Sequence, residues 1–168
     1  QRLTGFLNPS HDPRNQTYNI TESLIAIGSG QKSGRGVAGA SQTNLHFLPE
    51  NQTDFIFAVV GETYGFAGAA LVLSLYALLI WRSLRILMMA KNLYGTLISG
   101  GIVAMLMFQV FVNVGMTIGI MPITGVPLPL MSYGGSSVLV TFIAVGLLQS
   151  IHVQSRLAAA GKGRSLLS

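Results

Sequence analysis

Cysteine is absent from the 168 residues, and charged residues make up only 9% of the chain. The missing thiols exclude a disulfide framework, thiolate chemistry and a cysteine-ligated metal site within this sequence. Acidic residues are also absent beyond Glu62, because all five of them lie in the first 62 positions. Half of the residues are hydrophobic and the mean hydropathy is +0.56. This composition is typical of a membrane protein.

Two regions contain no Asp, Glu, Lys or Arg: Thr63–Trp81, which has 19 residues, and Asn92–Ser155. As a helix, the first region would be roughly 28 Å long, which matches the hydrocarbon core of a bilayer. The second is too long for one crossing and is interrupted by prolines and glycines. We therefore expect two spans within it, near Gly95–Ile120 and Ser136–Ile151. The predicted fold is all-α, a polytopic helical membrane protein with three transmembrane helices within residues 63–168.

Residues 1–62 are expected to form a large external loop with short helices, including an amphipathic helix at Ile20–Ile27. The glycine-rich run after it, GSGQKSGRG, is expected to be flexible and does not have the spacing of a nucleotide-binding motif. The chain begins without methionine, a signal-peptide pattern or a span, which favours the C-terminal part of a longer protein.

Basic residues set the expected orientation, since loops rich in Lys and Arg stay in the cytoplasm. The Arg82–Lys91 loop and the tail after Ser155 are basic, so both are expected to be cytoplasmic, and the Gly125–Ser136 turn external. The net charge of +5 thus reflects membrane topology and an anionic inner leaflet, and does not indicate nucleic-acid binding.

The Gly125–Ser136 segment, GVPLPLMSYGGS, is built from helix-breaking residues although it lies within an uncharged region. Unpaired backbone groups cost several kcal/mol each in lipid. Such a segment is therefore expected at the membrane surface, buried in protein or beside a polar cavity, and it indicates a site.

Four segments together resemble the shape, elongation, division and sporulation family of polytopic peptidoglycan glycosyltransferases. They occur in family order over essentially the whole chain and are LNPSHDP (Leu7–Pro13), SLIAIGSG (Ser23–Gly30), FLPENQTDFIFAVVGE (Phe47–Glu62) and GVPLPLMSYGGS (Gly125–Ser136). The elongation members are the most similar, because FLPE precedes TDFIF and SIH follows the last span. The resemblance implies lipid II as substrate, a class B penicillin-binding protein and the elongation machinery as partners, and a bacterial cytoplasmic membrane location with the active site facing outward.

The reaction implied by the resemblance is transfer of a growing glycan onto lipid II, with undecaprenyl pyrophosphate as the leaving group. Asp54, at the outer membrane boundary, is the candidate general base, and a divalent cation (Mg²⁺ or Mn²⁺) is a possible counterion for the diphosphate. No metal ligand set is evident. The candidate substrate-binding residues are Lys32, Arg35, Glu50, Glu62, Ser132 and Tyr133.

The chain departs from the family pattern at three positions: Gln52 and Thr63 stand where His and Glu are common, and Arg35 where Lys is usual. The first two changes argue against a mechanism that requires that histidine or a paired carboxylate. Arg35 keeps the positive charge and has a bidentate fork suited to phosphate.

Each candidate also has a structural interpretation. From the residues alone, Asp54 is equally expected as a helix N-terminal carboxylate, and the resemblance favours the base. Glu62 is favoured as a buried structural or cavity-lining acid, and the loop cations are by default solvated charges. Ser132 and Tyr133 either cap the last span or line the donor cavity. For the whole protein, a lipid flippase or transporter and a noncatalytic membrane scaffold remain alternatives to the enzyme.

Overall fold

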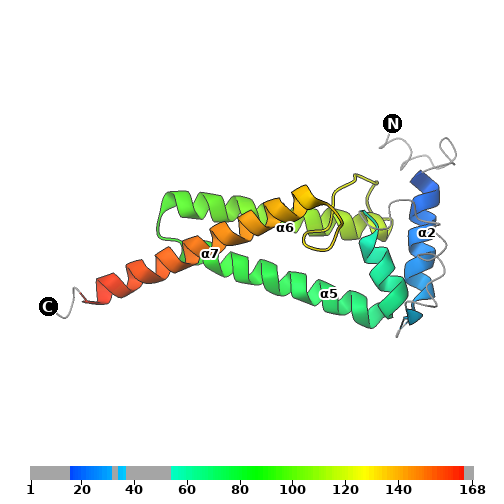
Figure 1. Cartoon of the computed structure of the whole chain (residues 1–168), viewed down its shortest axis with the longest axis horizontal. Helices are drawn as coiled ribbons and strands as arrows, with labels where there is room; N and C mark the ends of the chain where they lie inside the picture. The colour runs from blue at the N-terminus through cyan, green and yellow to red at the C-terminus, as the bar shows by residue number, and fades with distance from the viewer. Residues whose placement is uncertain (1–15, 32–33, 37–53, 165–168) are drawn as a thin grey trace.

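The computed structural model describes residues 16–31, 34–36 and 54–164, and every regular element within them is a helix. The predicted all-α class is therefore confirmed. The helices, labelled as in Figure 1, are α2 (Gln16–Ser29), α5 (Ile56–Met89), α6 (Leu93–Thr117) and α7 (Gly135–Arg164). The last three run lengthwise, and α2 lies across one end of them (Figure 1). All three are long and apolar enough to cross a membrane, as expected.

The first span extends beyond the predicted Thr63–Trp81 at both ends, because α5 begins at Ile56 and ends at Met89. The expected loop Arg82–Lys91 is thus corrected to a short connection around Lys91, and Arg85 lies within the helix. Its guanidinium lies 4.6 Å from the centre of the Trp81 ring. Arginine side chains at a helix end reach polar surroundings while their stems pack on apolar groups. A run without charged residues therefore predicts the part of the helix that faces hydrocarbon, but it does not predict where the helix begins and ends.

A kink divides α5 at Gly65, whose φ of 65° and ψ of −160° are open only to glycine. The nine residues before the kink run beside α2, and the longer part after it runs with α6 and α7 (Figure 1). The residues expected to mark the boundary between the external loop and the spans, Glu62 and Thr63, thus lie close to a real change of chain direction. Nothing in residues 1–15 or 37–53 is described, so the rest of the expected external loop lies outside the described residues.

The three long helices pack through a small apolar core formed by Ile86, Ile102, Leu106, Ala144 and Leu148. Their outward faces stay apolar and exposed: only 17%, 28% and 22% of the most hydrophobic part of α5, α6 and α7 is buried within this chain. Such faces suit lipid or other membrane helices, since large exposed apolar surfaces are unfavourable in water. The chain is an integral membrane protein.

Candidate functional site

The segment between α6 and α7 folds back against the helices, starting from a glycine-terminated helix end. Gly119 has a φ of 74°, and the N–H groups of Ile120 and Met121 both donate to the carbonyl of Gly115, at 2.9 and 3.1 Å. These bonds satisfy a carbonyl that the end of a helix would otherwise leave unpaired. The chain then folds back against α5 and the C-terminal part of α6.

Three contacts hold the middle of this loop. The Leu128 side chain is 1% exposed and packs with Phe57 and Tyr76, one on each side of the α5 kink. The Tyr76 hydroxyl donates to the carbonyl of Pro129, and the Ser132 hydroxyl accepts the N–H of Leu128 at 2.7 Å. A proline-rich segment beside a membrane helix thus has partners for several of its backbone groups, as the low-polarity surroundings require.

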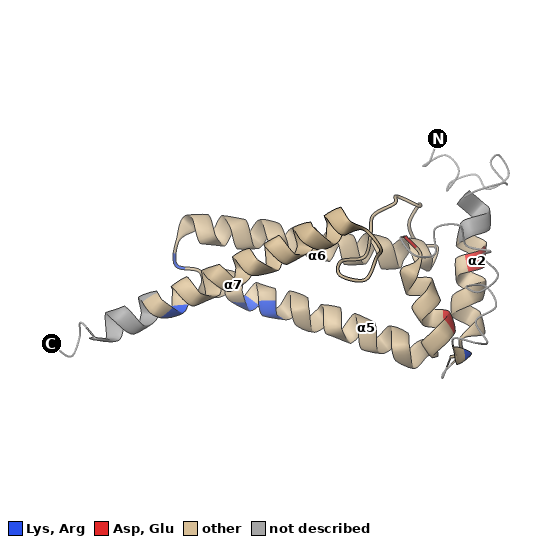
Figure 2. Ribbon diagram, in the orientation of Figure 1, with Lys and Arg blue, Asp and Glu red and all other residues tan. Residues whose placement is uncertain are grey.

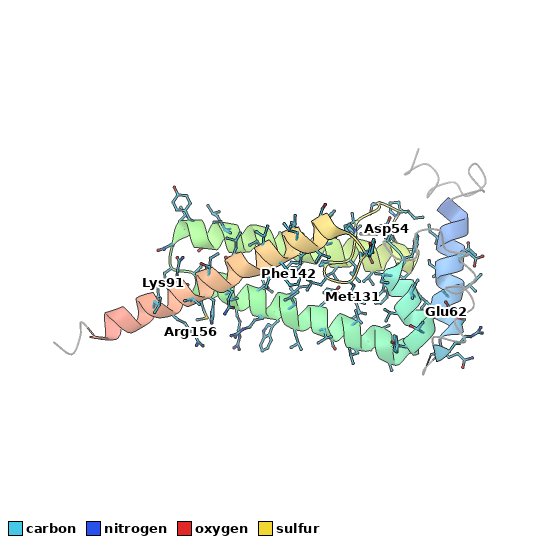
Figure 3. The ribbon with its side chains drawn as sticks, viewed as in Figure 1. Asp54, Glu62, Lys91, Met131, Phe142 and Arg156 are labelled. Atoms are coloured by element: carbon cyan, nitrogen blue, oxygen red, sulfur yellow. The ribbon has the colours of Figure 1, made fainter. Side chains whose placement is uncertain are left out.

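Asp54 lies at the start of α5, beside this loop (Figure 3). It is partly exposed and precedes Phe55, the N-cap of the helix, so it is outside the first helical turn. A Cβ atom added at Gly125 would lie 3.5 Å from Oδ2 of Asp54, so the carboxylate lies on the side of the turn towards which a side chain at position 125 would point. Because Gly125 has a φ of 73°, the turn that receives the carboxylate is also one that favours glycine.

Asn113 joins these pieces from within α6. Its side chain is fully buried, and Nδ2 donates both to the carbonyl of Asp54, at 3.0 Å, and to the carbonyl of Val126, at 2.8 Å. One amide therefore connects α6, the start of α5 and the Gly125 turn. Sequence reasoning missed this residue. An asparagine in an otherwise apolar span was the available signal, since polar side chains at membrane depth need partners.

The second predicted acid, Glu62, is elsewhere. It is fully buried at the opposite end of the first part of α5, beside α2, whereas Asp54 lies next to the α6–α7 loop (Figure 3). The two carboxyl groups thus lie at opposite ends of the first part of α5. This separation agrees with the interpretation that Glu62 does not act as a paired acid with Asp54.

Arg35 lies beside Glu62 through its backbone. Its N–H donates to the Glu62 carbonyl at 3.0 Å, and its side-chain Nε donates to the Ser29 carbonyl at 3.1 Å. The guanidinium remains exposed. Arg35 was expected on a flexible loop. In the structure its backbone is hydrogen-bonded to Glu62, close to the α5 kink, and this bond fixes the position of the residue.

The remaining candidates are not assembled around Asp54. Ser132 is 2% exposed and its hydroxyl accepts the N–H of Leu128 within the loop, which is not a cap on α7, whereas Tyr133 is 80% exposed. Lys32 and Glu50 lie outside the described residues. Among the described residues no three His, Cys, Asp or Glu side chains come together as a metal site.

An apolar groove adjoins the same loop. It has a volume of about 260 Å³ and is lined by Val72, Leu75, Tyr76, Leu79, Leu130 and Met131. Leu130 adopts a φ of 65°, which is uncommon for a residue with a side chain, and it lies on the groove wall. The loop therefore contributes to two surfaces, a polar one at Asp54 and an apolar one along α5.

Comparison with known proteins identifies relatives along nearly the whole chain. The family described as "Cell cycle protein", comprising FtsW, RodA and SpoVE, matches residues 1–157. Peptidoglycan glycosyltransferase RodA of Treponema pallidum is 48% identical over 153 residues, covering 91% of this chain and 35% of that protein. The probable peptidoglycan glycosyltransferase FtsW of Thioalkalivibrio sulfidiphilus is 46% identical over 154 residues, covering 90% of this chain and 38% of that protein.

A solved structure has the same arrangement of helices. It is described as "Structural coordination of polymerization and crosslinking by a peptidoglycan synthase complex", and it matches with a TM-score of 0.71 and 32% identity. The match covers 92% of this chain and 41% of that one. The chain therefore spans about two fifths or less of the length of these relatives.

Proposed function

Because the chain belongs to the family of cell cycle proteins that includes FtsW, RodA and SpoVE, we propose that the whole protein polymerises lipid II as a peptidoglycan glycosyltransferase with Asp54 as its general base. The acceptor sugar's hydroxyl attacks the anomeric carbon of the donor, the bond to undecaprenyl pyrophosphate breaks, and Asp54 takes the hydroxyl proton. Pyrophosphate is a good leaving group, so the reaction needs one base and cations near the diphosphate, without a strong general acid.

The observation that carries the proposal is the contact between the Asp54 carboxylate and the Gly125 turn. The partly exposed acid thus lies beside a loop that also borders an apolar groove along α5. A lipid-linked sugar has the same two parts, a polar reacting group and an apolar chain. The groove is a candidate site for part of that chain.

The cationic groups are assigned to the diphosphate of the substrate. Arg35, with Lys32 assisting, contacts the diphosphate, as an exposed guanidinium suits an anionic group. A divalent cation, Mg²⁺ or Mn²⁺, would act as a counterion of the diphosphate. The protein lies in the bacterial cytoplasmic membrane with Asp54 facing outward, and works with a class B penicillin-binding protein.

Within the family we infer the elongation role from two segments, FLPE before Asp54 and SIH, which lies within α7. Relatives named RodA and FtsW are 48% and 46% identical, so overall identity does not separate the two roles. The whole gene, expressed in cells depleted of their elongation enzyme, is expected to restore rod shape. Rescue of cells depleted of the division enzyme instead would contradict the elongation role.

The first prediction tests the base. Asp54→Asn keeps the shape of the side chain but cannot accept the proton, so it is expected to lower polymerisation by about a hundredfold or more. Glu62→Gln is the matched control on the same helix and is expected to lose less, because Glu62 is buried beside α2. Polymer formation is measured on the full-length protein with its penicillin-binding partner and lipid II.

The assay also requires that each variant still forms the complex and binds lipid II. Near-parental synthesis by Asp54→Asn would show that the base lies elsewhere. Parental protein that moves lipid II across vesicles without making polymer would support the flippase alternative, and protein that does neither would support a scaffold.

A further inference from the structure

Asn113 is a buried amide in a helix that is otherwise strongly apolar, and its side chain is 0% exposed. Burying an amide away from water is costly unless its polar atoms are paired. The partners that the structure provides therefore indicate what the residue is for.

Both of those partners are backbone carbonyls at the candidate site. Nδ2 donates to Asp54, 59 residues away in sequence, and to Val126, 13 residues away. The two bonds use both hydrogens of the amide group. Val126 follows Gly125, where an added Cβ would lie 3.5 Å from the Asp54 carboxylate, so a single side chain bonds to the backbone on both sides of this approach.

The other polar atom of the same amide has a different environment. Oδ1 of Asn113 is buried and has no hydrogen-bond partner among the described residues. A buried polar atom without a partner costs free energy. The two bonds that the amide does make are both to carbonyls at the candidate site.

We infer that Asn113 is a positioning residue of the proposed reaction, which fixes the Asp54 backbone against the Gly125 turn so that the carboxylate meets the acceptor hydroxyl. The inference rests on the proposed role of Asp54. Asn113 acts through Asp54 and does not touch substrate. A misplacement of about 1 Å in a reacting group can lower a rate about a hundredfold.

The second prediction is made for Asn113→Leu in the full-length complex. Leucine fills a similar volume and suits a membrane helix, but it donates no hydrogen bond. We expect kcat to fall about ten- to a hundredfold while KM for lipid II changes about twofold or less, because positioning of the base affects the transition state more than binding. Ser99→Ala is the matched control: Ser99 is also fully buried in α6, and its hydroxyl bonds only to carbonyls of its own helix.

The double variant Asp54→Asn/Asn113→Leu provides the decisive comparison. If Asn113 acts through Asp54, the double variant is no slower than Asp54→Asn alone, whereas independent effects multiply. Asn113→Ser, which retains one hydrogen-bond donor, is measured in the same assay. The melting temperature of each variant complex is recorded as well.

The outcomes separate this inference from the proposed function. Parental kcat in Asn113→Leu together with loss of activity in Asp54→Asn overturns the positioning role alone, and near-parental Asp54→Asn overturns the proposed base. If the Leu and Ser variants lose activity only in proportion to the folded complex recovered, the amide is a structural contact and the inference is wrong.

Discussion

At the scale of single residues, the candidate site depends on a glycine as much as on an acid. Gly125 has a positive φ, and a side chain there would project towards the Asp54 carboxylate. The added methyl group itself would make ordinary van der Waals contact at 3.5 Å from Oδ2. The backbone is the stronger obstacle, because a left-handed conformation costs a residue with a Cβ about 1–2 kcal/mol.

The third prediction follows from that strain. Gly125→Ala is expected to shift the turn away from Asp54 and to lower polymerisation about tenfold, while the complex stays folded, since a misplaced reacting group costs more in rate than in stability. Gly135→Ala is the control, because that glycine begins α7 and an added Cβ meets nothing within 4 Å. Equal activity of the two variants would show that the turn tolerates displacement and has no role in placing the carboxylate.

At the scale of elements, α5 bends where glycines let its backbone approach the backbone that follows α2. An added Cβ at Gly30 would meet the Gly61 carbonyl oxygen at 1.9 Å, and one at Gly65 would meet the Gly34 nitrogen at 2.3 Å. In a straight helix the N–H of Phe66 donates to the carbonyl of Glu62. Here Phe66 donates to Gln31 at 2.9 Å, and the Glu62 carbonyl accepts from Arg35 at 3.0 Å.

The fourth prediction concerns this exchange of hydrogen bonds. Gly65→Ala is expected to destabilise the protein by about 1–3 kcal/mol, because alanine does not tolerate this backbone conformation and its Cβ collides with the 30–34 segment. Gly101→Ala, in the interior of α6 with nothing within 4 Å of the added Cβ, is expected to be neutral or stabilising by up to about 1 kcal/mol. Thermal unfolding of the purified complex measures both, and an equally stable Gly65→Ala would mean that α5 straightens without penalty.

The elements differ in how far the sequence predicts them. Runs without charge predicted all three spans, and the spacing of apolar residues predicted the short helix at Ile20–Ile27, which is extended to Gln16–Ser29 in the structure. The kink at Gly65 was not predictable in the same way. Its hydrogen-bond partners lie about thirty residues earlier in the chain, and no local pattern reports a pairing between distant backbones.

The site shows the same limit. Asp54 and the Gly125–Ser136 segment were selected from the sequence as separate features, and the structure brings them into contact. Asn113 and Tyr76, the side chains that donate to carbonyls at Asp54 and on the loop, were not selected. Their roles depend on which backbone carbonyls lie nearby, and this follows from packing rather than from residue type.

At the scale of the whole molecule, charge is distributed along the long axis of the helices. Within the described residues, acidic side chains gather at the end where α2 lies, and most basic ones at the opposite end, where α5 joins α6 and α7 leaves the bundle (Figure 2). Arg35 is the exception at the acidic end. Since Lys and Arg are retained on the cytoplasmic side, this asymmetry supports an outward-facing Asp54.

The fifth prediction tests that orientation with single cysteines in a cysteine-free version of the full-length protein. Tyr133, 80% exposed on the α6–α7 loop, and Lys91, exposed between α5 and α6, lie towards opposite ends of the spans. In spheroplasts, a membrane-impermeant maleimide is expected to label Tyr133→Cys, and to label Lys91→Cys only after lysis. Labelling of position 91 and not 133, with both reactive after lysis, would place the Asp54 end in the cytoplasm. The proposed polymerisation of lipid II at the outer surface would then have no base there.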